Sequence, residues 1–239
     1  MSKPFVASYS RIKMERDCPL KFYHLEIAKD VEQPPYTKDS SDGVKAHARL
    51  ERCVEDGLDM PFSLKKYQWV LDHVRKNIRY AGPGTYEKPI TSIGTELKFG
   101  LNKRLDSCSF FDKDVKFRGV ADLALLNGII GHVYDYKNGN PKYADTGQLD
   151  YMALCMFVAY PQLKNVYGQL LFLNNPEEVF HTESYESGDL PFLKKQLVLW
   201  FKKIQRRKAE NNWPAQQSGL CKKHCPVPHS KCKYSGKAG

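Results

Sequence analysis

Residues 119–139 consist of two apolar, strand-like runs separated by Asn127 and Gly128. An Asn-Gly pair between apolar runs is a strong signal for a β-hairpin with a two-residue turn. A turn at these two residues pairs Leu126 with Ile129 and fixes every other pairing in the hairpin. The segment is therefore expected to form two adjacent antiparallel strands.

Three charged residues, Asp122, Asp135 and Lys137, lie within these apolar runs. The expected pairing places Asp122 opposite Val133, and the alternation of side chains puts all three charges on one face. Carboxylates on diagonal positions of one face are roughly 7–8 Å apart at Cα, which leaves room for a divalent cation. Half-exposed hairpins also alternate polar and apolar residues, so surface acids paired with a lysine are an equally good interpretation.

The net charge of +10 is concentrated at the C-terminal end of the chain. Residues 1–188 contain 25 Lys and Arg against 25 Asp and Glu, whereas residues 189–239 contain 12 against two. Clustered positive charge is typical of contact with a nucleic-acid backbone, and a solvated basic helix face is the alternative. The hydrophobic content of 41% excludes a disordered chain.

The localisation expected from the sequence is cytoplasmic, in a bacterium or a phage-infected host cell. No run approaches about 18 consecutive apolar residues, so no membrane association is expected. The N-terminus has no secretory apolar core. The sequence also contains no Gly-x-x-x-x-Gly-Lys-Ser/Thr phosphate loop, so the chain is not itself a P-loop motor.

Hydrophobic periodicity predicts an α/β fold, because helices precede a run of antiparallel strands and another helix separates the late strands. No repeat or change in composition demands a second domain, so residues 1–239 are expected to form one. Its parts are a helical portion at 1–89, a sheet core at 90–188, and a basic helix with a cysteine-rich tail at 189–239. Helices are expected at 8–29 with a break near Pro19, 41–56, 62–79, 143–159 and 190–211, and strands outside the hairpin at 91–102, 166–173 and 178–183.

Several short motifs follow one another in order along nearly the whole chain. They are Ser8-Tyr-Ser-Arg-Ile with Cys18-Pro-Leu-Lys-Phe-Tyr, Gly43-Val-Lys-Ala-His47-Ala-Arg-Leu-Glu51, Gly119-Val-Ala-Asp122, Asp135-Tyr136-Lys137 with Gly139, and Gln148-Leu-Asp-Tyr151. In combination they resemble the RecB-type branch of the PD-(D/E)XK nuclease superfamily, which includes the RecB and AddB nuclease domains, exonuclease V and the CRISPR adaptation nucleases. The resemblance implies a restriction-endonuclease-like core, in which helices flank a central mixed sheet.

The resemblance also implies a metal site and a metal-dependent nuclease reaction. His47, Asp122, Asp135 and the carbonyl of Tyr136 would be the metal ligands. Oxygen-rich sites with one imidazole suit Mg²⁺ or Mn²⁺, which generate hydroxide and neutralise charge on phosphate. Without the resemblance, an ordinary surface or core histidine is the better explanation of His47, because Lys45 and Arg49 lie near it on the helix.

Three further residues take roles from the same resemblance. Lys137 would stabilise charge on the scissile phosphate or orient the attacking water, and Gln148 and Tyr151 would position DNA or the lysine. Gln148 and Tyr151 also share a helix face, which suits ordinary helix–sheet packing. Glu96 is expected to be an exposed strand charge beside Lys98, with an extra active-site acid as the alternative.

Seven cysteines and no secretory segment argue against a disulfide framework. The resemblance implies that Cys18, Cys221, Cys225 and Cys232 hold a 4Fe-4S cluster, although the gaps between the last three are wider than in that pattern. A structural Zn²⁺ site is the alternative, because His224 and His229 lie among these cysteines. Free thiols in a loose tail are the third interpretation.

The leading hypothesis is an exonuclease that hydrolyses phosphodiester bonds of DNA ends or single strands in replication, recombination or viral genome processing. A separate helicase or recombination protein would be its partner. One alternative is a structure-specific endonuclease that cuts flaps or junctions. Another is a non-catalytic DNA-binding protein of the same fold.

Overall fold

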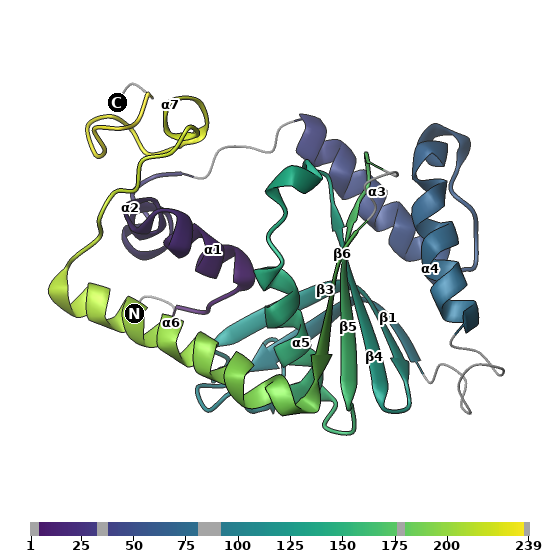
Figure 1. Cartoon of the computed structure of the whole chain (residues 1–239). Helices are drawn as coiled ribbons and strands as arrows, with labels where there is room; N and C mark the ends of the chain where they lie inside the picture. The colour runs from purple at the N-terminus through teal and green to yellow at the C-terminus, as the bar shows by residue number, and fades with distance from the viewer. Residues whose placement is uncertain (1–4, 33–37, 81–91, 176–179, 237–239) are drawn as a thin grey trace. The chain divides into compact units, whose positions relative to one another are not determined.

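The computed structural model describes residues 5–32, 38–80, 92–175 and 180–236 (Figure 1). The chain divides into two compact units, one made of Met1–Pro35 with Lys195–Gly239 and the other of Tyr36–Lys194. None of the described helices combines the length and apolar composition that a membrane span requires.

The second unit is built around a six-stranded sheet in the order β2-β1-β3-β4-β5-β6. Strands β4 and β5 are parallel and every other neighbouring pair is antiparallel, so the sheet is mixed. The parallel pair needs a crossover, and a helix after β4 supplies it. The strands are β1 (Ser92–Leu101), β2 (Ser107–Cys108), β3 (Phe117–Asn127), β4 (Ile130–Lys137), β5 (Asn165–Phe172) and β6 (Phe180–Glu186).

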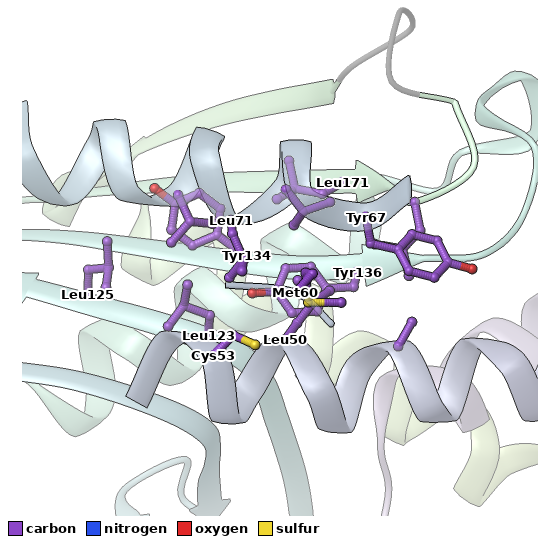
Figure 2. Packing of buried hydrophobic residues seen from close by; sticks show 14 residues of the cluster. Leu50, Cys53, Met60, Tyr67, Leu71, Leu123, Leu125, Tyr134, Tyr136 and Leu171 are labelled. Carbon is purple, nitrogen blue, oxygen red and sulfur yellow. The ribbon is translucent and has the colours of Figure 1, made fainter. Parts of the chain in front are cut away.

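Helices cover both faces of this sheet. α3 (Lys38–Glu55) and α4 (Gln68–Tyr80) cover one face, and a 3-10 turn at Phe62–Tyr67 leads into α4. Their apolar residues form one buried cluster with side chains from β3, β4 and β5 (Figure 2). The labelled members of this cluster are Leu50, Cys53, Met60, Tyr67, Leu71, Leu123, Leu125, Tyr134, Tyr136 and Leu171.

The crossover helix α5 (Gly147–Ala159) covers the opposite face. A Cβ placed on Gly131 would lie 2.9 Å from the Met156 side chain, and one on Gly168 would lie 3.2 Å from Leu149. Positions 131 and 168 therefore face α5, whereas Tyr134 and Leu171 face α3 and α4. These layers confirm the α/β fold with a mixed sheet flanked by helices.

The predicted β3–β4 hairpin is present, but the predicted pairing is wrong by two residues. Asn127 pairs with Ile130, so the two-residue turn is Gly128–Ile129 and not Asn127–Gly128. Gly128 has a φ of +58°, and a glycine at the first central position is typical of II′ hairpin turns. Because the shift is an even number of residues, it leaves the distribution of side chains between the two faces unchanged.

The first unit contains α1 (Tyr9–Asp17), α2 (Pro19–Phe22), a π-helical turn (Tyr23–Ala28), most of α6 (Leu190–Glu210) and α7 (Cys221–His224). The expected break of the first helix occurs at Cys18, whose backbone is extended. Pro19 then occupies the first position of α2, where its missing N–H costs no hydrogen bond.

Candidate active site

Asp122 and Asp135 lie opposite each other where the two central strands diverge. The β3–β4 ladder ends at the pair Leu123–Tyr134, and its register places Asp122 across from Asp135, not from Val133 as expected. Beyond this pair, the Asp122 carboxylate replaces the backbone partner, because its Oδ2 accepts the Tyr136 N–H at 2.6 Å. Both carboxylates are therefore held at one end of the ladder.

His47 reaches this pair from α3. Its Nδ1 lies 3.5 Å from Asp122 Oδ1, and its ring contacts the Tyr136 ring edge-on at 5.5 Å between centroids. Burial alone would lower the pKa of His47, but the hydrogen bond with Asp122 and the negative charges of Asp122 and Asp135 outweigh it. The net result is a raised pKa.

Asp135 is 5% exposed and is held by two polar side chains. Lys137 Nζ forms an ion pair with its Oδ2, and Gln148 Nε2 donates to its Oδ1. Lys137 Nζ also donates to Gln148 Oε1 at 2.5 Å, so the three side chains form a closed ring of contacts. Burial raises the pKa of Asp135, with Lys137 opposing the rise and Asp122 adding to it.

Tyr136 and Tyr151 have supporting positions at the edge of this site. The Tyr136 side chain lies in the apolar cluster with α3 and α4, where Figure 2 labels it. Its backbone N–H is the part that touches Asp122. On α5, the Tyr151 hydroxyl donates to the Arg118 carbonyl at 3.1 Å, so Tyr151 contacts the backbone of β3.

One glutamate, Glu96, lies beside Asp122, and a second, Glu51, is an electrostatic neighbour of Glu96. Glu96 lies opposite Asp122 in the β1–β3 register, between the pairs Thr95–Leu123 and Leu97–Ala121. Partial desolvation and the neighbouring charges of Asp122 and Glu51 raise the pKa of Glu96. Its side chain is exposed as expected, but its electrostatic neighbours are site residues as well as Lys98.

Sequence reasoning did not single out Glu51. The signal available was its position four residues after His47, because side chains at that separation share a helix face. Glu96 was considered from the sequence as an extra active-site acid, and the register of β1 against β3 places it opposite Asp122.

The donor set at this position fits a hard divalent cation. Two facing carboxylates, one of them almost fully buried, repel each other unless a positive charge lies nearby. Carboxylate oxygens with one imidazole are suitable ligands for Mg²⁺ or Mn²⁺. In the described part of the chain, no three His, Cys, Asp or Glu side chains are already grouped with metal-binding geometry.

The four cysteines expected to hold a metal centre all belong to the first unit, where each is a half-buried free thiol; they are Cys18, Cys221, Cys225 and Cys232. The backbone of Gln216 links two of them, because its N–H donates to Cys18 Sγ at 3.5 Å and its carbonyl accepts from Cys221 Sγ at 3.8 Å. Burial raises the pKa of the Cys225 thiol, and the thiols of Cys18 and Cys221 add to the rise. Three thiols are thus electrostatic neighbours.

Comparison with known proteins identifies the family. Among solved structures, a protein designated SSO0001 is 8% identical, with a TM-score of 0.34 over 83% of this chain and 78% of that protein. An alkaline exonuclease, LHK-Exo from Laribacter hongkongensis, is 10% identical, with a TM-score of 0.29 over 87% of this chain and 95% of that one. No match was found among curated protein sequences. A family model described as the PD-(D/E)XK nuclease superfamily matches residues 6–232, and the chain therefore belongs to this superfamily.

Proposed function

We propose that this protein is a metal-dependent deoxyribonuclease of the RecB-type branch, acting as an exonuclease. The observation that carries the proposal is the convergence of Asp122, Asp135 and Lys137 at the end of the β3–β4 ladder, with Gln148 completing the contacts. A buried acid beside a second acid and an amine is costly to maintain for stability alone. Membership of a nuclease superfamily supports the same conclusion.

His47, Asp122, Asp135 and the backbone carbonyl of Tyr136 would hold the Mg²⁺ or Mn²⁺ ion. When bound, such an ion lowers the pKa of water and neutralises charge on the phosphoryl oxygens. The chain itself fixes the ligands before the ion arrives. The Tyr136 N–H orients the Asp122 carboxylate, and the ring of Tyr136 supports the His47 imidazole from the apolar side.

Lys137 would act directly on the substrate phosphate. Its side chain is about one-third exposed while its ammonium group contacts both Asp135 and Gln148, so the group is oriented on a side chain that solvent still reaches. A fixed cation at this place stabilises the negative charge that develops on the phosphate or orients the attacking water. Gln148 is the positioning residue, because its amide contacts the carboxylate and the ammonium at the same time.

DNA is the proposed substrate, and the exposed cations of α6 support it. Lys195, Lys202 and Arg206 are exposed, whereas Lys203 and Arg207 are committed to an ion pair with Glu15. The excess positive charge near the C-terminus is therefore only partly available to a phosphate backbone. We also propose that the protein acts as an exonuclease in recombination, repair or phage genome processing. A separate helicase would cooperate with it.

The proposal is tested by incubating the purified protein with end-labelled linear DNA and with closed circular single-stranded DNA. In Mg²⁺ or Mn²⁺ the linear substrate is expected to be degraded and the circle to survive, and EDTA is expected to abolish the activity. Cleavage of the circle, or of flaps at internal positions, would establish the structure-specific endonuclease instead. DNA binding without cleavage in either metal would establish the non-catalytic alternative.

We also propose that residues 1–239 act as one nuclease domain and that the four cysteines hold a 4Fe-4S cluster, with structural Zn²⁺ as the second candidate. The family match spans sequence from both compact units, which supports a single domain. Thiolates favour soft or borderline metals, and both candidates are of this kind. The proximity of Cys18, Cys221 and Cys225 supports the proposal that these thiols bind one metal centre.

Metal analysis of anaerobically purified protein is expected to detect about four irons per chain, together with broad visible absorption that bleaches on reduction. Cys225→Ser is expected to remove both signals, whereas Cys53→Ser, in the apolar cluster, should leave them in place. One zinc per chain and no visible absorption would select the zinc site. Protein free of both metals would contradict the proposal.

A further inference from the structure

The turn between β2 and β3 presents an aromatic side chain to solvent that the proposed chemistry does not use. Phe111 is 75% exposed. Its neighbour Phe110 contacts it edge-on, with 5.0 Å between the ring centroids. The guanidinium of Arg118 lies 4.9 Å from the Phe110 centroid and 5.8 Å from that of Phe111. We call these three residues the Phe111 platform.

The platform is held in place by hydrogen bonds in and around the turn. Asp112 and Phe111 donate their N–H groups to Ser109, and Arg118 Nε donates to the Phe110 carbonyl at 2.7 Å. Gly100 permits the close approach of the turn to β1, because a Cβ there would lie 2.7 Å from the carbonyl oxygens of Cys108 and Ser109. An exposed ring in a turn of this kind is preorganised, which lowers the entropic cost of binding.

The platform and the candidate active site lie on the same strand. Arg118 and Asp122 are four residues apart on β3, which corresponds to about 13 Å at the usual rise per residue. The Arg118 carbonyl also receives the hydroxyl hydrogen bond of Tyr151, from the helix that carries Gln148. A strand of nucleic acid bound at the two carboxylates therefore needs only a few nucleotides to reach Phe111.

The charges around the turn favour contact with a base over contact with a phosphate. Asp112 and Asp114 accompany Lys113 and Lys116, so the turn itself is neutral and has no net attraction for a phosphate group. A flat ring beside a guanidinium offers stacking and cation–π attraction to an unpaired base. Stacking requires an unpaired base with a free face, so the matching occupant is single-stranded.

We infer that the Phe111 platform stacks an unpaired base of the substrate strand a few nucleotides from the scissile phosphate. This inference rests on the proposed nuclease function and adds a residue that sets the preference for single-stranded or frayed ends. Phe111 would be a binding residue remote from the chemistry. Its loss is therefore expected to change substrate affinity more than the rate of the chemical step.

The test uses single-stranded oligonucleotides carrying 2-aminopurine at successive positions, bound to the cleavage-deficient Asp135→Asn protein. Stacking on an aromatic ring is expected to quench the fluorescence at one or two adjacent positions. Phe111→Ala should remove this quenching and weaken binding roughly tenfold, in line with the effect of losing one base-stacking aromatic. Phe111→Tyr should restore both, because it retains the flat ring.

Phe62→Ala is the matched control, since Phe62 is 97% exposed but lies in the turn before α4. It should behave like the parent protein. With otherwise wild-type protein, Phe111→Ala is expected to raise the KM for single-stranded DNA and leave kcat within about twofold, a separation that a merely structural role would not give. If the wild-type protein cleaves DNA but Phe111→Ala changes neither the quenching nor the KM, this inference alone is overturned. Absence of cleavage by the wild-type protein, with position-specific quenching retained, would instead reject the nuclease proposal.

Discussion

Replacing Asp135 with asparagine is expected to reduce DNA cleavage by roughly a thousandfold, the upper range for loss of one electrostatic group from a preorganised site. The substitution preserves the size of the side chain and removes the negative charge that a divalent cation needs. The remaining amide oxygen can still accept from Gln148, but the amide nitrogen faces the ammonium of Lys137. The measurement is the single-turnover rate on end-labelled linear DNA at saturating Mn²⁺.

The fold is expected to survive this change. Lys137 is about one-third exposed, so its ammonium can turn toward water when the carboxylate is removed. Circular dichroism should show the helix content of the wild type. Asp72→Asn is the matched control, because Asp72 is an exposed acid on α4 that accepts from Gln68, and removal of its charge should leave the rate unchanged.

Gln148→Ala removes a second member of the ring of contacts formed by Asp135, Lys137 and Gln148, and its cleavage rate is compared with that of Asp135→Asn. Outer-shell partners of metal-binding carboxylates typically contribute 10- to 100-fold, so a loss of about this size is expected. If Asp135→Asn cleaves at the wild-type rate in the same metal, the assignment of the site is wrong. If Gln148→Ala loses as much activity as Asp135→Asn, Gln148 has a direct role and is more than a positioning residue.

The hairpin shows why an incorrect pairing still led to a useful prediction. An Asn-Gly turn was expected, but glycine at the first turn position moved the pairing by two residues. Side chains on a strand alternate with a period of two, so the shift left Asp122 and Asp135 on one face and placed them directly opposite each other. The distance between the carboxylates was thus less predictable than their common face.

Other parts of the site depend on contacts between distant segments. No local pattern places His47 beside Asp122, because the approach of α3 to the sheet follows from packing of its apolar residues against β3 and β4. Glu96 adopts a φ of +46° opposite Asp122, a conformation that strand propensity does not predict for glutamate. The short strand β2 was also missed, because two residues carry no measurable alternation.

The first unit contains a buried charge that sequence patterns did not identify. Glu15, on α1, is fully buried. Its Oε2 accepts the Trp200 indole N–H at 3.2 Å, and its Oε1 lies 2.8 Å from Arg207 Nε and 3.3 Å from Lys203 Nζ. These contacts join α1 to α6, and they explain why part of the basic helix is not free to bind phosphate.

Glu15→Ala is expected to lower the free energy of unfolding by about 3–5 kcal/mol, the usual cost of removing one partner from a buried ion pair. Arg207 is mostly buried and would keep its charge without the carboxylate, whereas Lys203 is partly solvated and contributes less. The measurement is urea denaturation followed by tryptophan fluorescence, because Trp200 reports on this contact.

Asp17→Ala, on the same helix, is the matched control. Asp17 pairs with Lys13 at the surface, so its removal should change stability by no more than about 1 kcal/mol. The loss of stability caused by Glu15→Gln should lie between those of Glu15→Ala and Asp17→Ala. The amide oxygen of the glutamine still accepts from Trp200, but the side chain no longer balances two cations. Equal effects of Glu15→Ala and Asp17→Ala would contradict a stabilising role for the buried carboxylate, and the contacts between α1 and α6 would then depend on apolar packing alone.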